Sequence, residues 1–166
     1  GAGEMGRWGD GERGRRWASV FAQDEWLEIA ASGQPAPVGV VEVGHFLYEP
    51  DPAVIREGEL AELCTMLDAH LFDDQIAYLV SAVQQLHNPF CRCFQIDEIH
   101  PFSLKLLNQR LQALQIGQVE LKKRGFPEEP EHLRPRLKLT PGGRDAVIFF
   151  TRRGDERILL IGRRIA

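Results

Sequence analysis

Residues 94–105 read FQIDEIHPFSLK, residues 119–127 read VELKKRGFP, and residues 132–139 read HLRPRLKL. Each stretch places apolar residues at the spacing of a strand or a helix, next to a short group of basic residues. The apolar pattern predicts a packed domain, and cations at the ends of its elements predict a charged surface of defined shape. This combination favours a folded module that binds a polyanion, with RNA as the expected ligand.

The composition predicts one domain, with or without a small appendage, because 43% of the 166 residues are hydrophobic and 27% are charged. The net charge of −4 conceals an asymmetry. Residues 92–166 hold 15 Lys or Arg against 9 Asp or Glu, a net charge of +6, whereas residues 1–91 hold 5 against 15, a net charge of −10. This distribution fits a basic binding face on the C-terminal half, although two ordinary solvated faces would also produce it.

Cysteine and histidine spacing gives no reason to expect a metal centre. Cys91 and Cys93 lie two residues apart on one expected strand face, but they have no second pair with ligand spacing, so we expect no structural zinc. With Cys64 the chain has three cysteines, and so few are typical of a protein whose thiols stay reduced. The chain has no stretch of 18 apolar residues and no basic, apolar leader, so we expect a cytoplasmic protein without a membrane partner.

The N-terminal part is expected to comprise residues 1–14, a glycine-rich flexible lead-in or linker, and residues 15–45, a β-hairpin with an extended arm. The hairpin strands are predicted at 16–22 and 26–31, with a turn at 23–24. Trp17 and Trp26 on these strands are candidates for stacking on bases, although aromatic residues in such positions more often belong to a core or an interface.

The remainder, residues 46–166, is expected to form an α/β (α+β) domain in which helices pack on a mixed sheet. Asp51 and Pro52 predict the start of a helix that extends to about residue 70, and Ser103 predicts the cap of a second helix that stops at Gly117. A third helix is predicted at 128–137. Strands are predicted at 75–83, 90–99 and 118–123 and in a terminal hairpin, 146–151 with 157–161.

Six basic residues are candidates for phosphate contacts: Lys105, Lys122, Lys123, Arg124, Arg136 and Lys138. Strand alternation places Lys122 and Arg124 on one face and Lys123 on the other. The alternative for these three is an internal salt bridge, for example between a buried Lys122 and Glu98.

The later basic residues have structural alternatives as well. Arg134, Arg136 and Lys138 would form a second phosphate-binding patch or pair with Glu128, Glu129 and Glu131. Arg152, Arg153 and Arg157 could reach a nucleic-acid groove, but an ordinary charged hairpin tip, with Gly154 at a positive φ, is the favoured interpretation.

Three motifs in order resemble one known family: LYEPDPAVIR at 47–56, PFSLK at 101–105 and VELKKRG at 119–125. They resemble the THUMP-like domain at the C-terminus of bacterial class I S-adenosylmethionine-dependent methyltransferases, over roughly residues 48–164. The chain departs from that pattern at Pro135, which interrupts the basic helix at a cost of about 3 kcal/mol in a regular interior.

The resemblance implies a parent enzyme whose Rossmann-like catalytic domain precedes this segment and holds S-adenosylmethionine. This chain has neither a glycine-rich loop after a strand nor an Asn/Asp-Pro-Pro-aromatic motif, so we expect no cofactor in it and no methyl transfer by it alone. The implied role is an accessory module that binds RNA (tRNA or rRNA) and positions it for the parent's methyltransferase domain. The alternative is a scaffold that packs on that domain without binding nucleic acid.

Overall fold

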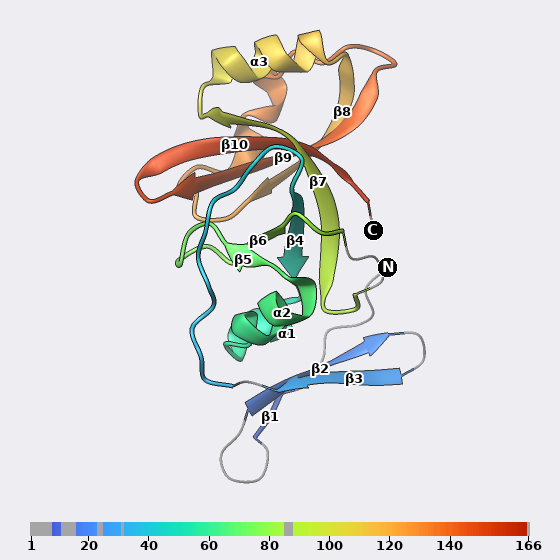
Figure 1. Cartoon of the computed structure of the whole chain (residues 1–166). Helices are drawn as coiled ribbons and strands as arrows, with labels where there is room; N and C mark the ends of the chain where they lie inside the picture. Colours follow the sequence, from blue (N-terminus) through green and yellow to red (C-terminus); the bar gives the residue numbers. More distant parts are fainter. Residues whose placement is uncertain (1–7, 11–15, 23–24, 31, 85–87, 166) are drawn as a thin grey trace. The chain divides into compact units, whose positions relative to one another are not determined.

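The computed structural model describes residues 8–10, 16–22, 25–30, 32–84 and 88–165, with side chains at Ser19 and from Ile29 onward. Figure 1 labels its helices and strands. The chain divides into two compact units. Unit 1 comprises residues 1–41, 45–94 and 165–166, and unit 2 comprises residues 42–44 and 95–164. The predicted boundaries at residues 14 and 45 stay predictions.

Unit 1 contains a small antiparallel sheet of β1 (Trp8–Asp10), β2 (Arg16–Ala22) and β3 (Glu25–Ala30) in that order. The predicted hairpin is confirmed, because Phe21 lies opposite Trp26 across β2 and β3. An additional strand, β1, lies within residues 1–14, where a linker was expected, and it pairs with β2. The predicted turn at 23–24 lies outside the described residues, and the side chains of Trp17 and Trp26 lie outside the described side chains.

Two short helices in unit 1 replace the single predicted one. Asp51 caps α1 (Pro52–Arg56) as predicted, because its Oδ1 accepts the Ala53 amide at 2.9 Å. The chain then turns at Gly58, whose φ of 72° is the left-handed conformation that glycine tolerates best, before α2 (Leu60–Leu67) begins. Both helices contribute to an apolar core with Tyr48 and Leu79.

Seven strands form a mixed sheet in the order β5-β6-β4-β7-β10-β9-β8, and the predicted α/β fold is confirmed. Unit 1 contributes β4 (Phe46–Pro50), β5 (His70–Leu71) and β6 (Leu79–Ser81). Strand β7 (Cys91–Pro101) runs through both units. Unit 2 contributes β8 (Ile116–Lys123), β9 (Arg144–Arg153) and β10 (Glu156–Arg164). Of the strand predicted at 75–83, only residues 79–81 form one, which is β6.

In unit 2, β9 and β10 form the predicted terminal hairpin with Gly154 at a φ of 61°, whereas β8 pairs with β9 in parallel. A parallel pair needs a crossover, and residues 124–143 provide it. The core between sheet, helix and crossover contains Leu107 and Leu111 of α3 (Leu104–Ala113), Leu133 of the crossover, and Ile148 and Phe150 of β9.

Two predictions in unit 2 were wrong in detail. The helix expected at 128–137 is instead two single 3-10 turns, η2 (Pro130–His132) and η3 (Arg134–Arg136), because prolines remove the amides that a continuous helix needs. Helix α3 ends before Gly117, since Gln115 takes the left-handed conformation with φ 56° and Gly117 lies within β8. The Ser103 cap is confirmed, because its hydroxyl accepts the Leu106 amide at 3.2 Å.

Candidate nucleic-acid interface

A groove of about 430 Å³ lies between α3 and the part of the crossover that runs from the end of η3 to Lys138. Helix α3 contributes Leu104, Lys105, Asn108, Gln109 and Gln112, and the crossover contributes Arg136 and Lys138. The α3 residues recur at spacings of three and four, which places them on one face of the helix. Three of the six predicted phosphate-binding residues therefore meet at one groove.

Asn108 joins the two sides of this groove. Its side chain is 9% exposed; its Nδ2 donates to the Arg136 carbonyl at 3.0 Å and its Oδ1 accepts the Lys138 amide at 2.8 Å. One carboxamide thus satisfies backbone groups on both sides of Leu137. Because these bonds fix the backbone at 136 and 138, they hold both basic residues beside α3.

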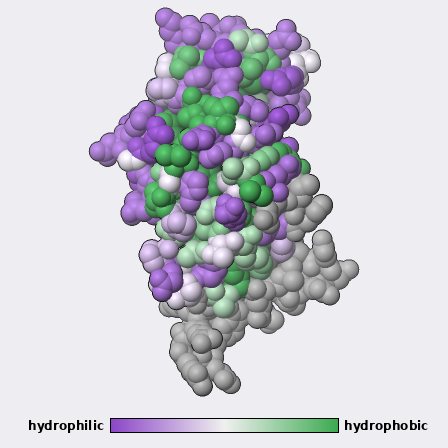
Figure 2. All heavy atoms as spheres, viewed as in Figure 1, coloured by the Kyte–Doolittle hydropathy of each residue, from purple (hydrophilic) through white to green (hydrophobic). Residues whose placement is uncertain are grey.

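The groove is positively charged. Lys105, Arg136 and Lys138 are exposed, and its lining contains no carboxylate. Within the described ranges, none of these three side chains forms an ion pair. Cations gathered around a hollow without an acidic partner concentrate positive potential there, and a phosphate would relieve their mutual repulsion. Figure 2 shows that mainly hydrophilic residues surround α3, at the upper end of the view.

The basic run at the end of β8 has a different environment. Lys122 Nζ lies 3.5 Å from Glu120 Oε1, rather than near Glu98, and Lys123 Nζ lies 2.9 Å from Glu129 Oε2. Burial alone would raise the pKa of Glu120, but Arg164 and Lys122 outweigh it and hold this pKa below its usual value. These contacts agree with the internal salt bridges considered as the alternative for Lys122 and Lys123.

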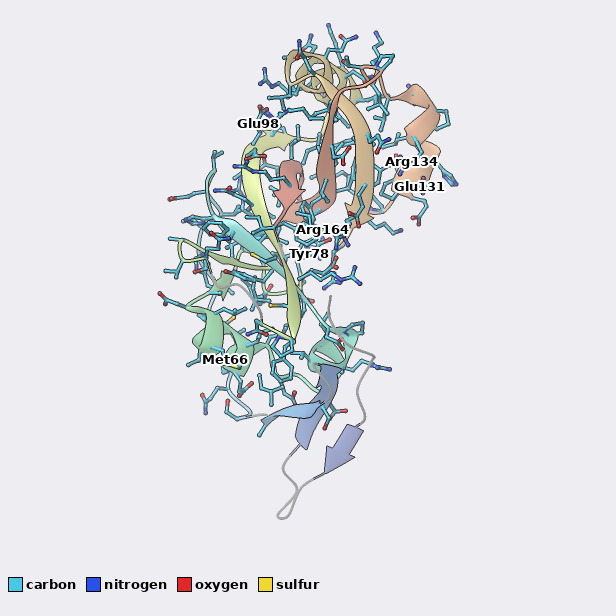
Figure 3. All side chains as sticks on the ribbon, turned by 90° about the vertical axis from the view of Figure 1, so that its right-hand side faces the viewer. Met66, Tyr78, Glu98, Glu131, Arg134 and Arg164 are labelled. Carbon is cyan, nitrogen blue, oxygen red and sulfur yellow. The ribbon has the colours of Figure 1, made fainter. Side chains whose placement is uncertain are left out.

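Two further arginines of unit 2, Arg134 and Arg153, also pair with carboxylates. Arg134 pairs with Glu131 through two contacts of 2.7 and 3.0 Å (Figure 3), and its Nη1 donates to the Val119 carbonyl at 3.1 Å. At the hairpin, Arg153 lies 3.5 Å from Glu156. Arg134 is therefore a structural residue, whereas Arg136 and Lys138 line the groove.

A half-buried carboxylate holds α3 through Arg110, which does not line the groove. Glu98 of β7, labelled in Figure 3, accepts bonds of 2.7 Å from both Nε and Nη2 of Arg110. His100 Nε2 lies 2.6 Å from the same carboxylate. The hydrogen bonds from Arg110 are the main reason that the pKa of Glu98 lies below its usual value. This network anchors the helix that carries Lys105 and Asn108.

The cysteines are unsuited to nucleophilic or metal chemistry. Burial raises the pKa of the Cys64 thiol to about 11 and that of the Cys91 thiol to about 12, so both are protonated at neutral pH. In the part of the chain that the structure describes, no three His, Cys, Asp or Glu side chains form a group that could hold a metal ion. No described helix is long and apolar enough to cross a membrane.

Sequence reasoning missed the three amides of the groove: Asn108, Gln109 and Gln112. A signal for Asn108 existed, because it lies between Leu107 and Leu111 at the edge of the apolar stripe of a helix. A polar residue there needs a buried hydrogen-bond partner. Nothing in the local pattern could identify that partner as the backbone of residues 136 and 138.

A comparison with known families agrees with the motifs. Residues 91–164 match the family described as THUMP domain-like, which is the resemblance that the sequence predicted. The match begins within β7, and the predicted domain start at residue 46 stays a prediction.

Longer proteins contain similar chains. Two relatives from Mycobacterium tuberculosis, strains CDC 1551 / Oshkosh and ATCC 25618 / H37Rv, are 33% identical over 140 residues, which is 84% of this chain and 37% of each relative. They are named uncharacterized S-adenosylmethionine-dependent methyltransferases MT3122 and Rv3037c. The chain therefore spans little more than a third of the length of the curated relatives it matches.

A solved structure shares the fold. It is a crystal structure of a candidate methyltransferase from Porphyromonas gingivalis W83, with a TM-score of 0.64 and 20% identity over 89% of this chain and 36% of that one.

Proposed function

We propose that this chain is the RNA-binding and substrate-positioning part of an S-adenosylmethionine-dependent RNA methyltransferase that acts in the cytoplasm. The observation that carries the proposal is the groove beside α3, where Lys105, Arg136 and Lys138 meet without an acidic partner among the described residues. The names of the two mycobacterial relatives support the connection with methyl transfer.

In this proposal the chain's own residues contact phosphates. Lys105, Arg136 and Lys138 bind at the groove, and Lys122, Lys123 and Arg124 extend the contact at the end of β8. Phosphate contacts position a nucleic acid without reading its sequence, which is the task of an accessory module. The methyl donor is held by the part of the parent enzyme outside this chain. Holding the target nucleotide near that donor contributes to the rate through proximity.

The proposal is tested by titrating fluorescent tRNA and rRNA fragments with the full 166-residue chain over a series of salt concentrations. We compare the wild type with a groove variant, Lys105→Ala/Arg136→Ala/Lys138→Ala. We expect the groove variant to bind about tenfold or more weakly, and the slope of log affinity against log salt to become shallower by about 0.7 to 0.9 for each lost phosphate contact.

A charge-matched control separates the groove from the overall charge. Arg153→Ala/Arg163→Ala/Arg164→Ala also removes three exposed cations, but each of these lies beside a carboxylate: Glu156, Asp97 and Glu120 respectively. We expect this variant to bind nearly as well as the wild type. Equal losses in both variants would show that only net charge matters. Absence of RNA binding by the wild type would favour the scaffold that packs on the methyltransferase domain.

A Lys122→Ala/Lys123→Ala/Arg124→Ala variant tests the second part of the patch. Since Lys122 and Lys123 already pair with Glu120 and Glu129, we expect a smaller loss of affinity than in the groove variant.

A further inference from the structure

The groove contains amides as well as cations, and this combination suggests what it binds. Gln109 and Gln112 are exposed on the α3 face that lines it, three residues apart. Within the described residues neither side-chain amide has a hydrogen-bond partner. Backbone phosphates need donors only, and the three cations already supply them. The two glutamines add acceptors as well as donors.

A carboxamide presents one donor and one acceptor side by side, which matches the edge of a nucleobase. In an A-form RNA duplex the major groove is too deep and narrow for side chains to read, whereas an unpaired base exposes its hydrogen-bonding edges.

We infer that the groove takes one unpaired nucleotide of an RNA strand. Gln109 and Gln112 bond the edge of its base, and Lys105, Arg136 and Lys138 bond the adjacent phosphates. This inference rests on the proposed RNA binding and names its substrate class as single-stranded RNA.

Asn108 has a separate role in this arrangement. Both ends of its amide are occupied by backbone groups of residues 136 and 138, so it shapes the groove and does not read the base. The two glutamines are thus the amides of the groove with capacity for a ligand. Each lies within two turns of Lys105 on the same helix face, as a base and its own phosphate require.

The test uses the full chain and short fluorescein-labelled homopolymers of A, C, G and U, with an RNA duplex of equal length. We expect the wild type to bind single strands more tightly than the duplex and to prefer one homopolymer over the weakest by about tenfold. The Gln109→Ala/Gln112→Ala variant should bind all four homopolymers with nearly equal affinity. Its salt slope should stay unchanged because no charge is removed. Gln118→Ala, an exposed amide on β8, is the control and should behave as the wild type.

Three results would overturn the inference. One is equal affinity of the wild type for duplex and single strand, and another is equal affinity for all four homopolymers. The third is an unchanged preference in the double glutamine variant. In all three the RNA still binds, so the proposed function stands. Absence of binding to every RNA would instead overturn the proposed function and this inference with it. Thermal unfolding of each variant checks that the fold is intact.

Discussion

At the scale of single residues, Asn108 connects the stability of unit 2 with the shape of its groove. Its side chain is buried at the edge of the apolar stripe of α3, and both of its polar atoms bond to the crossover backbone. A buried amide satisfied in this way costs little, but its removal leaves the Arg136 carbonyl and the Lys138 amide without these partners.

Asn108→Ala should therefore lower the free energy of unfolding by about 1–3 kcal/mol. It should also weaken RNA binding by several fold, although no charge is lost. Urea unfolding and the anisotropy titration measure the two effects. Gln109→Ala, which removes an exposed amide from the same helix, should leave stability within about 0.5 kcal/mol of the wild type. An Asn108→Ala variant as stable as this control would contradict the role of Asn108.

Glu98 predicts a dependence of stability on pH. Its folded-state pKa is lowered, chiefly by the hydrogen bonds from Arg110, so the ionised form is favoured in the folded protein. The associated stability is fully present above the unfolded-state pKa and is lost as the pH falls through the folded-state pKa. Acidification below the usual range of a glutamate should therefore weaken the attachment of α3.

Glu98→Gln should be less stable than the wild type at neutral pH, and the difference should disappear in acid. Chemical unfolding of both proteins over a pH series measures it. Glu156→Gln is the comparison, since Glu156 forms an exposed pair with Arg153 at 3.5 Å, and such pairs contribute little. A stability difference for Glu98→Gln that persists or grows in acid would show that Glu98 does not act through its charge.

At the scale of elements, the crossover between β8 and β9 decides where the groove forms. Its two 3-10 turns are too short to bury a continuous helical face, yet Leu133 and Leu137 still pack into the core of unit 2. The end of η3 and the extended chain after it bring Arg136 and Lys138 alongside α3, where a regular helix over 128–137 would have distributed its basic residues around its axis.

The start of β8 lies close to the end of this crossover. A Cβ on Gly117 would lie 2.5 Å from the Thr140 carbonyl oxygen and 2.6 Å from the Gly143 amide nitrogen. Both are backbone atoms, which cannot move aside as a flexible side chain can. Gly117 therefore allows β8 and the turn before β9 to approach each other.

Gly117→Ala should destabilise the protein by about 1–3 kcal/mol, the usual cost of overpacking. Thermal unfolding of this variant beside Gln118→Ala, at the next and exposed position of β8, measures the effect. A Gly117→Ala protein that unfolds at the wild-type temperature would show that this contact relaxes easily.

At the scale of the whole molecule, residues 92–166 have a net charge of +6, and their cations lie in two kinds of environment. Lys122 and Lys123 face carboxylates, whereas Lys105, Arg136 and Lys138 surround a groove without acids. The net charge of a region therefore does not show which of its cations face carboxylates; the tertiary structure does.

The proposed division of labour with the rest of the parent enzyme has its own test. We expect the 166-residue chain to bind RNA but to transfer no methyl group from S-adenosylmethionine. Incubation with tritiated S-adenosylmethionine and total RNA measures this, with the full-length mycobacterial relative as the comparison. Incorporation of label by the chain alone would contradict the accessory role.

The sequence by itself determined the features that depend on neighbouring residues: the strand around residues 91–101, the caps at Asp51 and Ser103, and the β9–β10 hairpin with Gly154 at its tip. Periodicity and capping are local, so a single chain reveals them. The helix predicted over 128–137 was wrong, because an acidic start with Pro130 in the first turn fits a helix locally, whereas Pro130 and Pro135 together limit this segment to two 3-10 turns.

Only the tertiary structure decided which cations act together. The bonds of Asn108 to residues 136 and 138 span 28 and 30 positions of sequence, and no local pattern encodes such a contact. The pair of Arg110 and Glu98 likewise joins a helix to a strand across 12 positions of sequence. Sequence supplied the six candidate cations, whereas packing of α3 against the crossover placed three of them around one groove and left carboxylates beside two others.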